Sequence, residues 1–316
     1  MPPTSTPPLA SRAGAVLDRL LVDGYAVVDA LLDHRTTTEM QRRVQHLLDH
    51  ERAHPFDPGP DAPQPAADMG EWYTRIWKLS DEERHRLAQR LVLQQQAEFD
   101  TPWPIPPEDV CISFIHIPTL FDGGRSQRIF NLINKDTAFA PLVEHPLVMA
   151  IIEDQLGADA ILLDVSVNAV GAGTPDGGWH LDSPLTQVPE PLPNFTLSLQ
   201  IVWMLDDFRR DNGATRVVRG SHLTLRKPPT GHGELAEEVV LEAPAGSLAM
   251  WFSQTWHRHA ANHTDAVRRG LIVQYGRCWV KPFVDLRTPM TAEQATSLSP
   301  RIRYMMGCNA NAPVRG

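Results

Sequence analysis

Residues 250–275 read MWFSQTWHRHAANHTDAVRRGLIVQY, an apolar run followed by a polar turn and a second apolar run. The first run ends at His257 and the second begins at Arg268, so this stretch predicts two β-strands joined by a turn. From about residue 111 onward, further β-rich runs are separated by Gly, Pro, Asn and Asp, which indicates a mainly β protein. These runs cover residues 111–117, 160–170, 196–204, 237–241, 247–252 and 270–279.

The chain before residue 111 favours helices instead. Apolar residues at helical spacing predict helices over 12–21, 35–52, 80–99 and, within the β-rich part, 141–156, with a strand over 24–30. Helices first and many strands later predict a β-sandwich or jelly roll with helices packed outside it. We expect residues 1–10 to be a disordered tail and 11–316 a single domain. Within that domain, 53–110 is expected to be an insertion or lid and 111–285 the jelly-roll core.

The tetrapeptide Trp179-His180-Leu181-Asp182 is the sharpest candidate for a metal site. In a strand, residues two apart point to the same face, so His180 and Asp182 can bind one ion together. An imidazole, a carboxylate and one further ligand form the facial triad of non-haem Fe(II) oxygenases. Taken alone, the pair could equally be a histidine in a surface turn and a solvated aspartate.

A third ligand is expected from the distal stretch, because His257 follows His180 by 77 residues and ends an apolar strand. Arg268, which starts the next strand, suits the far carboxylate of a small dicarboxylate bound to the metal, since its fork pairs bidentately with carboxylates. His257 could instead be a core histidine, and Arg268 a solvated charge. By spacing alone His259 is a rival ligand, whereas His263 lies in the turn.

Several segments, taken in order, resemble one enzyme family, the phytanoyl-CoA dioxygenase-like family of Fe(II)/2-oxoglutarate oxygenases. The resemblance covers roughly residues 110–310, with a weaker match in the N-terminal helix and strand. The segments that carry it are 139–148, 152–157, the pair His180 and Asp182, 205–208, 212–222, Trp256-His257, Asn262, Arg268 and 299–307.

The resemblance implies a double-stranded β-helix, the cupin-like jelly roll, that is mainly β with flanking helices. It implies Fe(II) bound by His180, Asp182 and His257, with 2-oxoglutarate and O₂ as cosubstrates. Arg268 would pair with 2-oxoglutarate, and Thr215 would lie near it. The family's distal pattern also favours His257 over its neighbour two residues on, and Arg268 over the arginine that follows it.

The sequence departs from the family pattern at two positions. Gly178 stands where some relatives have a glutamine that helps to hold 2-oxoglutarate, and Arg219 replaces a proline. Asn168 is a candidate replacement for the glutamine, although a structural hydrogen bond would explain an asparagine in a strand equally well. Residues 53–110 match nothing in the family pattern.

The composition of the chain argues against several classes of protein. The net charge is −9 and the basic residues form only pairs such as Arg209-Arg210, so a nucleic-acid partner is disfavoured. No apolar run approaches the roughly 20 residues that span a bilayer, and no secretory signal is recognisable. The three cysteines, Cys111, Cys278 and Cys308, are far apart, which argues against a disulfide framework and favours the reducing cytoplasm.

The expected function is hydroxylation of an unactivated C–H bond of a small specialised metabolite, with release of succinate and CO₂. Desaturation, epimerisation and cyclisation use the same oxidant and stay open. Two other classes remain as alternatives, a non-catalytic metal-binding jelly roll and a cupin-type enzyme that works without 2-oxoglutarate. Side chains that could line the substrate pocket are Phe114, His116, Arg128 and Trp179.

Overall fold

The structure is a computed structural model that describes residues 8–53, 119–282, 284, 286–287 and 290–308. The predicted strand at 111–117, the predicted helix at 80–99 and most of the 53–110 segment lie outside these residues. In the described part, helix α1 begins at Leu9, two residues before the predicted start of the folded domain.

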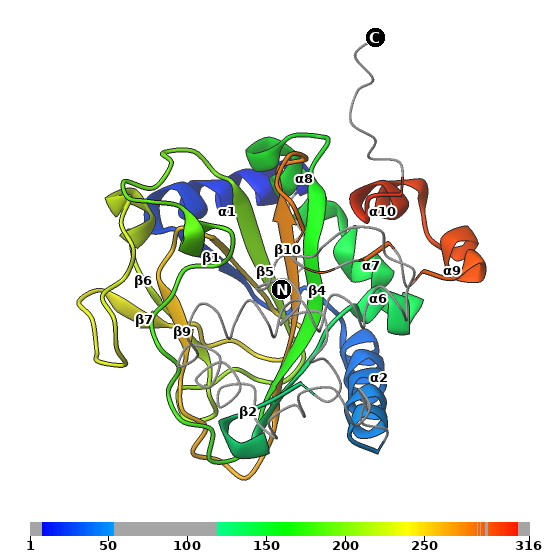
Figure 1. Cartoon of the computed structure of the whole chain (residues 1–316), viewed down its shortest axis with the longest axis horizontal. Helices are drawn as coiled ribbons and strands as arrows, with labels where there is room; N and C mark the ends of the chain where they lie inside the picture. Colours follow the sequence, from blue (N-terminus) through cyan, green and yellow to red (C-terminus); the bar gives the residue numbers. More distant parts are fainter. Residues whose placement is uncertain (1–7, 54–118, 283, 285, 288–289, 309–316) are drawn as a thin grey trace, which may run out of the picture.

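Two antiparallel sheets form the β part of the fold (Figure 1). The large sheet has seven strands in the order β1-β8-β5-β10-β4-β3-β2, and the small sheet has three in the order β7-β6-β9. Apart from β2 and β3, which follow each other directly, neighbours in the large sheet are separated by long stretches of chain, so the sheet forms only when distant segments meet. The strands are β1 (Tyr25–Val28), β2 (Thr119–Phe121), β3 (Ser126–Ile129), β4 (Ile161–Val170), β5 (Ser198–Met204), β6 (Thr215–Val218), β7 (Glu238–Val240), β8 (Leu248–Phe252), β9 (His257–His259) and β10 (Arg268–Gly276).

Helices cover the outer face of the large sheet, with α1 and α8 lying across it in Figure 1. The α-helices are α1 (Leu9–Asp23), α2 (His34–Ala53), α6 (Leu132–Lys135), α7 (Ala140–Val143), α8 (Pro146–Leu156), α9 (Ala292–Ser297) and α10 (Pro300–Met305). The 3-10 turns are η1 (Asp122–Gly124), η2 (Thr137–Phe139), η3 (Leu185–Gln187) and η4 (Ser221–Thr224). None of the described helices is both long and apolar enough to cross a membrane.

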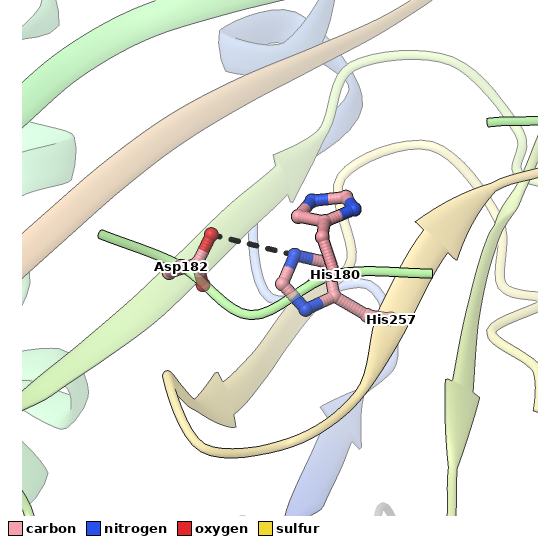
Figure 2. A group of neighbouring side chains, drawn as sticks. All are labelled: His180, Asp182 and His257. Atoms are coloured by element: carbon pink, nitrogen blue, oxygen red, sulfur yellow. Dashed lines mark ion pairs between the residues drawn. The ribbon is translucent and has the colours of Figure 1, made fainter. Parts of the chain in front are cut away.

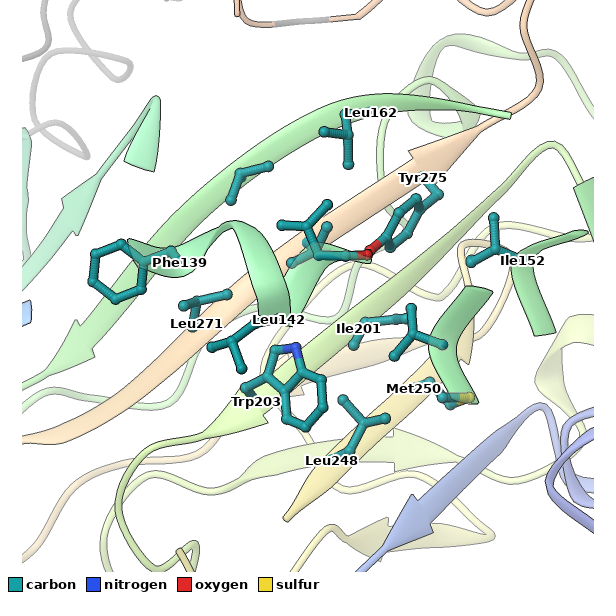
Figure 3. Packing of buried hydrophobic residues seen from close by; sticks show 14 of the residues in the cluster. Phe139, Leu142, Ile152, Leu162, Ile201, Trp203, Leu248, Met250, Leu271 and Tyr275 are labelled. Carbon is teal, nitrogen blue, oxygen red and sulfur yellow. The ribbon is translucent and has the colours of Figure 1, made fainter. Parts of the chain in front are cut away.

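Side chains of the central strands point alternately to the two faces of the large sheet. One face packs against the helices in the hydrophobic core, and the other faces the space between the two sheets. On β10, Leu271, Val273 and Tyr275 face the helices and belong to the main core (Figure 3). Arg268 and Gln274, on the same strand, face the other way. This period of two is the geometry of a β-strand, and it gives each central strand one apolar face and one face available for chemistry.

The inner face of the large sheet meets the small sheet through a second apolar cluster that includes Val202, Phe208 and Trp251. Residues before His180 extend the small sheet, because Gly177 donates its amide to the carbonyl of His259 at 3.0 Å. The fold is therefore mainly antiparallel with flanking helices, as predicted. In the part of the chain that the structure describes, the two sheets face each other and do not close into a barrel.

Several features of the strands differ from the sequence prediction. The apolar strand expected to end at His257 is wrong, because β8 ends at Phe252 and His257 begins β9 in the small sheet. Strands β2, β3 and β6 were not predicted, because they are only three or four residues long. Strand β10 begins at Arg268, as the distal stretch predicted and two residues before the β-rich run 270–279, and it ends at Gly276, three residues before the end of that run. The earlier start matters for function, since it places Arg268 inside a hydrogen-bonded strand. Of the cysteines, Cys278 and Cys308 are free thiols.

Candidate active site

A cavity of about 450 Å³ lies between the two sheets. Its walls come from the inner faces of the large sheet, from strands β6 and β9 and from the segment around His180. The side chains that line it are mixed, with aromatic and aliphatic groups beside charged and amide groups. They include Phe121, Asp122, Ser126, Arg128, Phe130, Asn168, His180, Asp182, Gln200, Val202, Thr215, Trp251, His257, His259, Arg268, Ile272 and Gln274.

The structure brings His180, Asp182 and His257 together at one wall of this cavity (Figure 2). One ligand atom from each residue lies within 4.8 Å of the other two. The two histidines meet because their backbones pair, with N–O distances of 3.0 and 3.1 Å in the two directions. Nε2 of His257 lies 3.4 Å from Oδ1 of Asp182. Backbone pairing thus joins ligands that are 77 residues apart in the sequence.

Backbone carbonyls set the tautomers of both histidines. Nδ1 of His180 lies 2.9 Å from the carbonyl of Gly178, and Nδ1 of His257 lies 3.0 Å from the carbonyl of Thr255. Because a carbonyl only accepts, each Nδ1 carries the proton and each Nε2 keeps its lone pair. Metal-binding histidines in proteins are oriented in this way. The donor set therefore fits a divalent transition metal such as iron.

Charges in the triad are coupled. Burial, together with the nearby His257, lowers the pKa of His180 to about 4, although its side chain has surface open to the cavity. Burial opposes the charge on Asp182, but the neighbouring His257 outweighs it and the pKa of that carboxyl falls below its usual value. Asp182 in turn raises the pKa of His257. Trp251 holds the other carboxylate oxygen with an Nε1–Oδ2 distance of 3.3 Å.

Arg268 lines the same cavity, and its positive charge is buried with no carboxylate partner among the described residues. Its side chain is almost fully buried, its guanidinium donates to the carbonyl of Gly213 at 2.5 Å, and it stacks 4.3 Å from the Phe208 ring centroid. Its buried Nε has no hydrogen-bond partner, and among the described residues it forms no ion pair. Burial lowers the pKa of Arg268 to about 10. Such a cation fits a bound carboxylate, which would supply the missing charge and acceptors.

The side chain of the neighbouring Arg269 points to the opposite face of β10 and has an acidic partner of its own. Its Nε and Nη2 bind the two carboxylate oxygens of Asp206 at 2.9 and 2.7 Å. Alternation on β10 therefore leaves Arg268, and not Arg269, available to the cavity, in agreement with the family pattern.

A tight turn holds the acceptor for Arg268. Gly213 has φ +83°, and a Cβ there would lie 2.9 Å from Cγ1 of Val170. Glycine is thus required both for its left-handed backbone and for space. The side chain of Asn212 closes the turn by accepting from the amide of Arg209 at 2.8 Å and donating to the carbonyl of Asp207 at 2.7 Å.

The remaining predicted residues divide into those that reach the cavity and those that do not. Thr215, Asn168 and His259 line it, and so does Arg128. His259 lies outside the group of possible ligands that His257 completes.

Four other positions lie away from the cavity lining. His263 is exposed in the turn, and Arg219 is an exposed residue near Asp23. Trp179 is buried, and its Nε1 donates to the carbonyl of Gly233 at 2.7 Å. Gly178 faces the 231–232 loop. Phe114 and His116 lie outside the described residues.

Some lining residues were not found from the sequence. Gln200 and Gln274 sit opposite each other on β5 and β10, and both face the cavity. A single glutamine inside an otherwise apolar strand was a usable signal for each of them. Trp251 gave no signal, because a tryptophan in an apolar strand looks like core.

Comparison with known proteins identifies the family. A profile of the phytanoyl-CoA dioxygenase (PhyH) family matches residues 113–270, which is half of the sequence. The chain belongs to the phytanoyl-CoA dioxygenase family. This membership confirms the resemblance noted in the sequence.

The curated relatives that the chain matches are distant in sequence. Dioxygenase cdmA of Talaromyces verruculosus is 31% identical over 148 residues, which is 45% of this chain and 48% of that protein. The chain spans about half the length of the curated relatives it matches.

Solved structures share the fold at low identity. The epimerase SnoN, in complex with Fe³⁺, α-ketoglutarate and nogalamycin RO, superposes with a TM-score of 0.52 at 18% identity and covers 87% of this chain and 88% of its own. The carbocyclase SnoK gives a TM-score of 0.55 at 16% identity, covering 94% and 95%. These likenesses support the jelly-roll fold expected from the sequence.

Proposed function

We propose that the protein is an Fe(II)- and 2-oxoglutarate-dependent oxygenase that hydroxylates an unactivated C–H bond of a small-molecule metabolite, releasing succinate and CO₂. The proposal is carried by one observation. A histidine–aspartate–histidine group and an arginine without a carboxylate partner face the same cavity. A metal site alone would not need the arginine, and a structural arginine would not need the metal group.

His180, Asp182 and His257 would hold the iron, and Arg268 would bind the distal carboxylate of 2-oxoglutarate. Thr215 and Asn168 are the proposed additional contacts, since both line the cavity. Asn168 thereby takes the part of the glutamine that is absent at position 178. When bound, iron and 2-oxoglutarate supply the oxidising power from O₂, and the chain orients the target bond and keeps water away.

The cavity is suited to that second task. Beside the polar groups, it has apolar walls from Phe121, Phe130, Val202 and Ile272. Apolar walls favour a carbon skeleton and exclude water from the reacting bond. A small metabolite fits a cavity of about 450 Å³ that also has to hold 2-oxoglutarate.

The same site is compatible with reaction outcomes other than hydroxylation. SnoN and SnoK are described as an epimerase and a carbocyclase, so the fold also supports outcomes without net oxygen insertion. Product mass separates these outcomes. Hydroxylation adds one oxygen atom, desaturation and ring closure remove two hydrogens, and epimerisation leaves the mass unchanged.

Anaerobic titration tests the proposal. Fe(II) and then 2-oxoglutarate are added to metal-free protein, and the visible charge-transfer band of the iron–2-oxoglutarate chelate is followed. We expect a band in the wild type and none in His257→Ala. His263→Ala, a histidine in the exposed turn, is the matched control and should keep the band. Folded, iron-loaded wild type that gives no band would contradict the proposal and favour a non-catalytic binding protein.

A further inference from the structure

A second arginine faces the cavity at a distance from Arg268. Arg128 on β3 pairs with Asn168 of β4, and Asn168 pairs with Gly270 of β10. Strands in a sheet are about 4.8 Å apart, so Arg128 starts two strands, or roughly 10 Å, from the strand that carries Arg268. The two arginines therefore serve different parts of the cavity.

Buried neighbours hold the guanidinium of Arg128 by one edge. Its Nη2 lies 2.7 Å from Oδ2 of Asp164 and 3.0 Å from Oγ of Ser166, and its Nε lies 3.2 Å from the same Oγ. Ser166 donates its hydroxyl to Oδ2 of Asp164 at 2.5 Å. Asp164 and Ser166 are both fully buried. The orientation of Arg128 is thus fixed from behind, in the way that binding sites are preorganised.

Within the described part of the chain, the other edge of Arg128 has no partner. Its side chain keeps 27% of its surface, and the described residues provide no hydrogen-bond partner for its Nη1. The guanidinium lies 4.9 Å from the centroid of the Phe130 ring, and Phe121 lines the same cavity. Arg128 thus lies against one aromatic ring at a cavity wall that carries a second.

The charge of Arg128 separates its role from that of Arg268. Asp164 compensates Arg128, whereas among the described residues Arg268 has no carboxylate partner. Arg258 also lines the cavity, but the His232 carbonyl and Glu238 occupy its two terminal nitrogens. With 2-oxoglutarate assigned to Arg268, the oriented donor on Arg128 is therefore left for the primary substrate. We propose that Arg128 binds an acceptor oxygen of the primary substrate, carboxylate, phenolate or carbonyl, while an aromatic or apolar body packs against Phe121 and Phe130. This inference rests on the proposed function and names its substrate class.

The test uses the iron-loaded protein under anaerobic conditions with saturating 2-oxoglutarate, which keeps the Arg268 site filled. The probes are 1-naphthoate and 1-naphthalenemethanol, which share the ring system and differ in the acceptor group. Their Kd values are measured by naphthyl fluorescence. We expect the wild type to bind the carboxylate about tenfold more tightly than the alcohol, a usual effect of one charge-assisted bond. Arg128→Gln should abolish this preference and keep the charge-transfer band.

Arg125→Gln is the matched control, because Arg125 lies in the turn directly before β3, is exposed and does not line the cavity. It should bind both probes as the wild type does. Arg128→Gln leaves Asp164 buried without its cation, so the double variant Arg128→Gln/Asp164→Asn is measured as well, and it should also lose the preference.

Equal binding of the two probes to the wild type, or no binding of either, would overturn the inference. So would a preference that survives in both Arg128 variants. In these cases a normal charge-transfer band in the wild type shows that the proposed function still stands. A wild type that forms no band fails the proposed function itself.

Discussion

Replacing Arg268 by methionine removes the guanidinium and keeps most of the apolar stem. In the wild type this group donates to the Gly213 carbonyl at 2.5 Å and, among the described residues, has no ion pair. If it binds the distal carboxylate of 2-oxoglutarate, the variant leaves that carboxylate without a counter-charge in a buried place. Loss of one partner of a buried charge pair costs about 2–5 kcal/mol. A value of about 3 kcal/mol corresponds to roughly 150-fold weaker binding of 2-oxoglutarate.

Arg268→Met is expected to weaken 2-oxoglutarate binding, but it is not expected to lower the stability of the ligand-free protein. Burial lowers the pKa of Arg268 to about 10, so the folded state holds the charged form less well than the unfolded state does. Below the folded pKa the arginine is charged in both states, and the folded state bears this cost at neutral pH. Methionine removes this cost and loses the Gly213 hydrogen bond and the cation–π contact with Phe208, each worth about 1 kcal/mol. Ligand-free Arg268→Met should therefore be at least as stable as the wild type.

Arg269→Met is the matched control, since it removes the adjacent arginine that binds Asp206 outside the cavity. It should keep the 2-oxoglutarate affinity and lower the free energy of unfolding by about 1 kcal/mol. Affinity is read from the anaerobic charge-transfer band, and stability from guanidinium denaturation without ligand. Arg268→Met that binds 2-oxoglutarate within about threefold of the wild type, or Arg269→Met that loses it, would refute the reasoning.

Three further substitutions test the geometry around the site. Gly213→Ala should lower the free energy of unfolding by about 1–3 kcal/mol, because Gly213 has φ +83° and the Val170 side chain is close. It should also weaken 2-oxoglutarate binding, because the Gly213 carbonyl that accepts from Arg268 would move. Denaturation and titration that both match the wild type would argue against this. His259→Ala should bind Fe(II) within about threefold of the wild type, since His259 lies outside the ligand group, and loss of metal in a binding titration would mean that the ligand assignment is wrong. Asn262→Ala should cost about 2–3 kcal/mol in thermal or chemical unfolding, because its amide donates to the carbonyls of Val170 and Ala266; an unchanged midpoint would show that water replaces these bonds.

Much of the fold was predictable because strand and helix periods are local properties. The β-rich runs 160–170 and 270–279, bounded by turn residues, predicted strands β4 and β10, and the apolar spacing of 12–21 and 35–52 predicted helices α1 and α2. Strands β2 and β3 escaped prediction because they are only three and four residues long. Pairing makes them strands: β3 pairs with β4 and β2 pairs with β3, in registers that no local pattern specifies.

The candidate site was partly predictable for the same reason. His180 and Asp182 are two residues apart, and Arg268 begins a strand, so residue types and short spacings were enough to propose them. Spacing could not choose between His257 and His259, since both lie on the same face of β9. The family pattern favoured His257, and in the structure the pairing of its backbone with His180 brings only that ring into the ligand group.

The sequence by itself thus determined the secondary structure of the central strands, the family and the residues proposed to bind metal and 2-oxoglutarate. Only the tertiary structure decided which charges are compensated. Arg268, Arg269 and Arg128 look alike in the sequence, yet Asp206 neutralises the second and Asp164 the third. The partners lie 63 residues away for Arg269 and 36 for Arg128. Strand register sets these long-range contacts, and burial sets their energy, so neither can be obtained from local sequence patterns.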